Sequence, residues 1–300
     1  MAIGGLRGTD GRTKAAAAAL VIVATTTLWA RLVSAQTTTP QTTEQPVARA
    51  ERPSTEELAK QSQNPLAFLM SSPFQNDVNF DFGPDHRTQD VLYLLPVYPV
   101  SLGSKLSLIT RTVVPLIFQP NAAPATGTHF GMGDIQFSAY FSPKLNGNLT
   151  VGVGPAVLLP TGTITGLFAQ NTGQWCIGPA GAITYSPGRL VFGLLVNNIF
   201  SINGRDNAPS VDALALQPFF NVILPRAFFL TTSPTITADW ERPNDQRWLV
   251  PIGAGFGAVF KIGSLAFNAN AQAYWNAVRP DGAALWTLRL TIGTLFPSKN

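Results

Sequence analysis

The stretch from Leu265 to Ala277, LAFNANAQAYWNA, decides the fold class of this chain. Every second residue from Leu265 onward is apolar, and the residues between them are nearly all polar. Successive side chains of a β-strand point to opposite faces, so the alternation predicts a strand with one apolar and one polar face. Asn268, Asn270 and Gln272 lie on the polar face.

The same alternation recurs in segments far away in the sequence. Residues 286–296 place Arg289 on the polar face of the last segment, and residues 135–141 place Gln136 opposite three phenylalanine and isoleucine side chains. From Phe74 onward the pattern predicts twelve strands.

The connections between these strands alternate in length. Five short ones fall at 102–105, 143–147, 186–189, 224–227 and 262–264. Six longer ones fall at 83–88, 119–130, 160–174, 203–211, 239–247 and 278–284. Transmembrane β-barrels have short periplasmic turns and longer external loops, so the alternation favours a barrel.

A soluble β-sandwich would also show alternating strands, with the apolar face turned inward. Three features favour a barrel in lipid instead. Charged residues gather in the expected loops, long and short connections alternate strictly, and tryptophans such as Trp275 and Trp286 lie near strand ends, where an interfacial girdle needs them. The sequence therefore predicts an all-β chain: an antiparallel transmembrane β-barrel of about 12 strands, preceded by a short N-terminal periplasmic helix.

The N-terminal region divides into three parts. Basic residues precede an apolar run that ends near a small-residue cleavage pattern, so residues 1–35 are predicted to be a signal peptide cleaved after Ala35. Residues 36–53 are rich in Thr, Gln and Pro and are predicted to be a disordered tether. Residues 54–72 are predicted to be a short helical periplasmic segment, and residues 73–300 are predicted to form the barrel.

The helix has a clear start and stop. Ser54 can accept a hydrogen bond from a free backbone amide while Glu57 reaches back, as in a capping box. The helix should end near Gln63, because Asn64 precedes Pro65. A helix that lies outside the barrel, on the periplasmic side, is favoured over a plug inside the lumen.

Polar residues on the inward faces are candidates for a solute path. They are Arg111, Asp134, Gln136, Asn268, Asn270, Gln272 and Arg289. A charge facing lipid is costly, so Arg111, Arg289 and Asp134 should point inward, either as a zone that selects solutes or as an ion pair that braces the wall. Small inward residues such as Gly152 and Gly257 either leave space for a ligand or let a segment pack against the wall.

Seven prolines fall inside the expected strands. They are Pro96, Pro115, Pro155, Pro179, Pro218, Pro234 and Pro251. Proline cannot donate to a strand ladder, so several of these residues should mark bulges or lie near a rim.

The composition argues against several other classes of protein. Removal of residues 1–35 takes away four basic groups and one acidic group, so the net charge falls from +4 to +1 and predicts no nucleic-acid partner. His86 and His129 fall in expected external loops without a nucleophile motif, so no enzyme, cofactor or metal is expected. The carboxylates between Asp77 and Asp90 are attributed to solvated external loops. Cys176 should be a buried apolar residue.

Several short motifs resemble a bacterial family of outer-membrane barrels that are classed as transporters. They are ELAKQSQNPLA at 57–67, SPFQND at 72–77, RTQDVL at 87–92, ITRTVVP at 109–115, GMGDI at 131–135 and GVGPA at 152–156. Members are grouped with phenol meta-pathway barrel proteins, and some carry a neuromedin-U-like name. The resemblance implies an outer-membrane location and a transport role, and it brings no established binding residues.

Two function classes follow from the sequence. In the first, the barrel passively conducts small apolar or aromatic solutes across the outer membrane. In the second, it is a structural or adhesive surface barrel with a blocked lumen, whose external loops bind a partner. The expected partners are outer-membrane lipid and a small-molecule solute, and a homo-oligomer is left open.

The barrel reading predicts a heat-modifiable protein. Closed strand ladders resist detergent, so unboiled and boiled samples of the mature protein should migrate differently on a denaturing gel. Recovery in the soluble periplasmic fraction, with no shift between the two samples, would contradict the membrane assignment.

Overall fold

The computed structural model describes residues 53–120, 128–163, 172–202 and 210–297. The predicted signal peptide and tether lie outside these residues. The described chain forms one α-helix, α2 (Thr55–Ser62), two short 3-10 helices, η2 (Pro225–Ala227) and η3 (Asn244–Gln246), and fifteen strand segments in a single sheet. Helix α2 begins as the sequence predicts, because Ser54 Oγ accepts a hydrogen bond from the Glu57 backbone N–H at 3.1 Å.

The strand segments make twelve crossings of the barrel, as predicted. Nine crossings are single strands: β1 (Leu69–Phe82), β4 (Leu106–Pro120), β7 (Leu149–Leu159), β8 (Cys176–Tyr185), β9 (Leu190–Ser201), β10 (Asp212–Ile223), β13 (Trp248–Ile262), β14 (Leu265–Val278) and β15 (Trp286–Pro297). Three are interrupted pairs: β2 (Arg87–Leu94) with β3 (Val97–Ser101), β5 (Thr128–Met132) with β6 (Ile135–Pro143), and β11 (Phe228–Thr232) with β12 (Ile236–Asp239). The barrel begins at Leu69, four residues before the predicted boundary.

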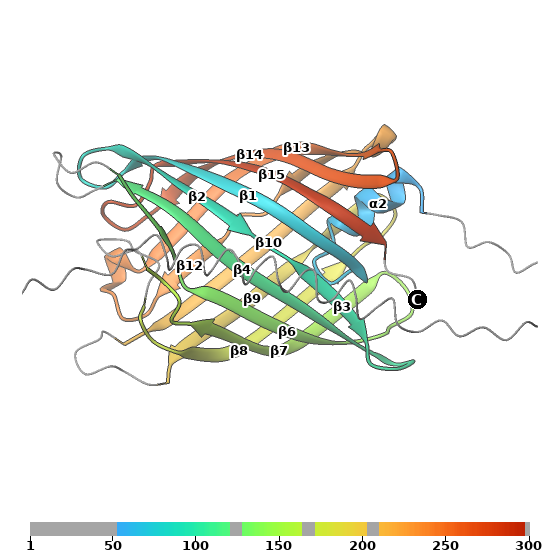
Figure 1. Ribbon diagram of the computed structural model, residues 1–300, viewed down its shortest axis with the longest axis horizontal. Helices are drawn as coiled ribbons and strands as arrows, with labels where there is room; N and C mark the ends of the chain where they lie inside the picture. Colours follow the sequence, from blue (N-terminus) through green and yellow to red (C-terminus); the bar gives the residue numbers. More distant parts are fainter. Residues whose placement is uncertain (1–52, 121–127, 164–171, 203–209, 298–300) are drawn as a thin grey trace, which may run out of the picture. The chain divides into compact units, whose positions relative to one another are not determined.

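Each crossing pairs antiparallel with the next one along the chain, and β1 pairs with β15 to close the sheet. The closing register runs from Leu69 opposite Pro297 to Phe80 opposite Trp286. Figure 1 shows the tilted strands wrapping around a common axis. Short turns gather at one end, which is the periplasmic end in outer-membrane barrels.

Two of the interrupted crossings break at a proline, and the third breaks at a glycine. Pro96 lies between β2 and β3, Pro234 lies between β11 and β12, and Gly133 precedes the start of β6. Pro251 lies at a register shift between β13 and β14. The prediction that several prolines mark bulges is therefore confirmed for Pro96, Pro234 and Pro251.

Pro155 and Pro179 lie inside continuous strands and face each other across β7 and β8. Pro155 does not pair with β6, and Pro179 does not pair with β9, because proline has no N–H to donate. The preceding residues, Gly154 and Gly178, let the neighbouring strand come close. A Cβ atom there would lie 1.8 Å and 1.7 Å from a backbone oxygen of that strand, so only glycine fits.

The apolar face of the strands is the outer face. Leu290 and Ile292 are 44% and 51% exposed, whereas Gln272 and Arg289 on the opposite face are 4% and 7% exposed. No helix in the described part of the chain has the length and apolar character that crossing a membrane requires. The exposed apolar surface on a closed sheet defines a barrel whose outside faces lipid.

One polar pair lies on this outer face. Asn76 and Asp90 have the same facing as the exposed Phe74, and the Asn76 amide donates to the Asp90 carboxylate. The hydrogen bond lowers the cost of placing the two groups toward lipid, since each would otherwise lack a partner.

Helix α2 lies in the periplasmic mouth of the barrel, and the prediction of a helix outside the lumen is wrong. Leu58 and Ala59 are 1% and 0% exposed, and both pack against inward residues of β1, β10, β13, β14 and β15. Figure 1 shows α2 beside the end of β15. The short helix buries its two apolar residues because the barrel supplies apolar wall there, which periplasmic solvent would not.

The facing of the strands predicts how arginine is tolerated. Leu290→Arg should destabilise the folded barrel by about 2 to 4 kcal/mol, because the charge faces lipid near the middle of β15. Asn270→Arg is the control, since it places the same residue on the inner face of the neighbouring strand. Urea unfolding in lipid vesicles measures both free energies, and the opposite ranking would mean that the faces are reversed.

Candidate functional site: the barrel lumen

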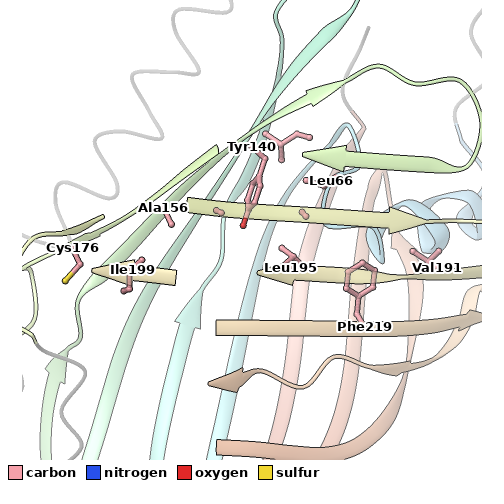
Figure 2. Close-up of a cluster of buried hydrophobic side chains, with 11 residues drawn as sticks. Leu66, Tyr140, Ala156, Cys176, Val191, Leu195, Ile199 and Phe219 are labelled. Carbon is pink, nitrogen blue, oxygen red and sulfur yellow. The ribbon is translucent and has the colours of Figure 1, made fainter. Parts of the chain in front are cut away.

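The segment from α2 to Leu69 crosses the lumen from one wall to the other. Leu58 and Ala59 pack on the β10–β15 side, whereas Leu66 belongs to a cluster with Ile109 and Tyr140 on the β4–β9 side. Figure 2 shows Leu66 beside Tyr140, with the other side chains of the cluster along the inner wall. We call residues 54–68 the plug, because they occupy the periplasmic end of the lumen.

Inward glycines make room for the plug and for the side chains around it. A Cβ atom at Gly152 would lie 3.4 Å from the Leu66 side chain, and one at Gly257 would lie 2.4 Å from the Phe229 ring. Phe229 itself packs in the cluster that holds α2. Of the two readings of these glycines, the structure favours packing of a segment against the wall.

Arg289 holds three parts of the inner wall together. Its Nε and Nη2 donate to the two carboxylate oxygens of Asp77, both at 2.9 Å, across the closing β1–β15 pair. Its Nη1 donates to the Ser233 carbonyl oxygen at 3.0 Å, beside the break at Pro234. The Tyr274 hydroxyl accepts from the Ser233 backbone N–H at 2.9 Å. These side chains thus satisfy the backbone groups that the proline leaves without a ladder partner.

Asp77 is a lumen residue, and its attribution to a solvated external loop is wrong. It is 7% exposed, in the middle of β1, and carries the ion pair with Arg289.

Arg111 reaches across the barrel. It lies on β4, and its Nη1 donates to Gln217 Oε1 on β10 at 3.4 Å. At least four other crossings separate β4 from β10 in either direction around the sheet, so this contact bridges opposite walls. Both residues line a cavity of about 180 Å³ that the plug bounds on the periplasmic side. The sequence pattern singled out Arg111 but not Gln217, because only closure of the barrel brings the two together.

The hydrogen bonds of Asp134 involve neither Arg111 nor Arg289. Its carboxylate accepts from the Gly162 backbone N–H at 2.8 Å and from the backbone N–H and hydroxyl of Thr172 at 2.6 and 2.8 Å. It is 5% exposed and holds both ends of the long connection after β7. The grouping of Asp134 with Arg111 and Arg289 as one charged zone is therefore not what the contacts show.

The remaining predicted lumen residues form three separate sets of contacts. Asn268 donates to Ser62 Oγ in the plug at 3.2 Å. Gln272 donates to Asn270 Oδ1 at 2.9 Å and accepts from the Tyr274 hydroxyl, next to the Arg289 network. Gln136 donates to the Ser138 hydroxyl at 3.5 Å on its own strand. Their place in a solute path stays a prediction.

The residues considered for chemistry are dispersed. His86 is exposed in the turn after β1 and contacts Asp81 of that strand. His129, expected in a loop, lies in β5. Cys176 is buried and free, in agreement with the prediction of an apolar role. Within the described ranges, no three His, Cys, Asp or Glu side chains come together as a metal site would require.

A closed antiparallel barrel with an apolar outer surface, a polar lumen and short turns at one end is a transmembrane β-barrel of the bacterial outer membrane. Residues 87–292 match the model of the family described as "Putative MetA-pathway of phenol degradation", and the chain belongs to that family.

Two solved structures are similar to the chain, and the first of them shares its fold. An outer membrane channel from Pseudomonas putida F1 is 15% identical, with a TM-score of 0.54, over 76% of this chain and 95% of that one. The NanC porin is 10% identical, with a TM-score of 0.46, over 76% of this chain and 98% of the porin. No curated protein matches the chain.

The ion pair at the closing seam predicts a sharp stability effect. Arg289→Gln leaves the buried Asp77 carboxylate without its cation and should lower the free energy of unfolding by about 3 to 5 kcal/mol. The double variant Asp77→Asn, Arg289→Gln removes both charges and should recover a large part of that loss. Urea unfolding of the three proteins in lipid measures the difference. Equal losses in the single and double variants would show that the two charges are not coupled.

Proposed function

We propose that this barrel is a passive channel for small apolar or aromatic solutes and that the plug narrows its periplasmic end. The observation that carries the proposal is the cavity of about 180 Å³ inside the wall, between the plug and the contact of Arg111 with Gln217. Twelve strands enclose a wider interior than the eight-stranded barrels that side chains fill. A lumen of this width that retains free space is suited to a small solute.

The walls of the cavity support this class of solute. Val97, Leu195 and Phe219 supply an apolar side, and Gln61, Gln217 and Ser233 supply a polar one. A surface of both kinds suits a compact molecule with an apolar body and few polar groups. The description of the family, which refers to phenol degradation, supports the same class of solute.

A second function is supported by the plug itself. Leu58, Ala59 and Leu66 are at most 3% exposed, so the plug is packed as firmly as a protein core. A structural or adhesive surface barrel would keep its lumen blocked in this way. The two functions differ in whether displacement of the plug opens a path.

Displacement of α2 tests the proposal. Leu58→Asp places a charge in the apolar cluster and should unseat the helix, which should raise single-channel conductance in planar bilayers several-fold over the unsubstituted barrel. Glu57→Asp is the matched control, because it places the same residue on the exposed face of the same helix and should leave conductance unchanged. If the Leu58→Asp barrel is folded and still does not conduct, the channel is excluded and the structural barrel is favoured.

A further inference from the structure

The cavity beside the plug has one charged wall. Among the described residues that line it, Arg111 is charged and all the others are neutral. The polar neighbours belong to the plug, to three strands and to the break between β11 and β12, and they include Gln63, Asn64, Ser71, Gln217 and Ser233. The space is therefore a mainly neutral chamber with a single guanidinium in its wall.

The charge of Arg111 is not neutralised by a carboxylate. Its Nη1 donates to the neutral Gln217, at the long distance of 3.4 Å. The Asp77 carboxylate on the lumen wall is already held by Arg289 through two hydrogen bonds of 2.9 Å. Among the ion pairs of the described residues, none includes Arg111. A cation inside a barrel is costly without a counter-charge, so its position favours an anion in the chamber.

We propose that the chamber binds a small organic carboxylate, with the carboxylate on Arg111 and an apolar ring against Leu195 and Phe219. A guanidinium presents parallel N–H donors that match the two oxygens of a carboxylate. A volume of about 180 Å³ exceeds the cavity of roughly 150 Å³ that holds benzene in another protein. The inference names the solute of the proposed channel and in that respect rests on the proposed function.

Equilibrium binding tests the site without any need for conduction. Benzoate and benzamide have nearly the same shape, but only benzoate carries a charge. Calorimetric titration of the detergent-solubilised barrel should show benzoate binding at least about tenfold more tightly than benzamide. Arg111→Gln should abolish this preference, and Arg111→Lys should keep part of it because the charge remains while the paired donors are lost.

Arg189→Gln is the control, because it removes the same charge from an exposed position in a short turn. It should leave the preference for benzoate unchanged, and a heat-dependent gel shift confirms that each variant is folded. Equal binding of benzoate and benzamide, or an unchanged preference in folded Arg111→Gln, would overturn the site. Benzoate binding by a barrel that does not conduct after α2 is displaced would support the site and reject the channel, so the two failures are distinguishable.

Discussion

The pairing of β1 with β15 is the contact on which the rest of the structure depends. In lipid, backbone N–H and C=O groups cannot form hydrogen bonds with water. A sheet can therefore span a membrane only if its first and last strands pair. Twelve registered residue pairs join the two strands, and the buried ion pair of Asp77 with Arg289 links their inner faces. The seam fixes which face of each of the two strands points inward. Through the contact of Arg289 with Ser233 it also positions the interrupted crossing of β11 and β12, which β13 and β14 separate from β15.

The interior is the reverse of a soluble core. Its middle carries charges and amides. Two of its apolar clusters include plug residues, and one of these continues along the wall as far as Cys176 and Ile199. Burial of Leu58, Ala59 and Leu66 against those clusters is the ordinary hydrophobic effect, here acting inside a barrel whose outer surface is also apolar. The inner wall thus has two roles: apolar residues pack against the plug, and polar and apolar residues together line the chamber next to it.

The sequence predicted the wall well and its contents poorly, for a physical reason. Alternation from Leu265 to Ala277 reports the two sides of a strand directly, so Asn270 and Gln272 could be placed inward without a structure. Helix α2 carries too few apolar residues to show whether they meet solvent or a wall. The contact of Arg111 with Gln217 depends on which strands face each other after the barrel closes. The local alternation of apolar and polar residues does not determine strand order or stagger.

The position of the plug in the sequence constrains how the barrel assembles. Helix α2 ends at Ser62, and β1 begins only a few residues later at Leu69. Most ladders join neighbouring strands, but the last one joins residues such as Asp77 and Arg289, 212 positions apart, and contacts of such separation form late. The plug is covalently joined to the strand that completes the wall, so it arrives at the mouth together with that strand. The chain therefore has no need to thread a finished cylinder, because the cylinder is completed around its own N-terminal segment.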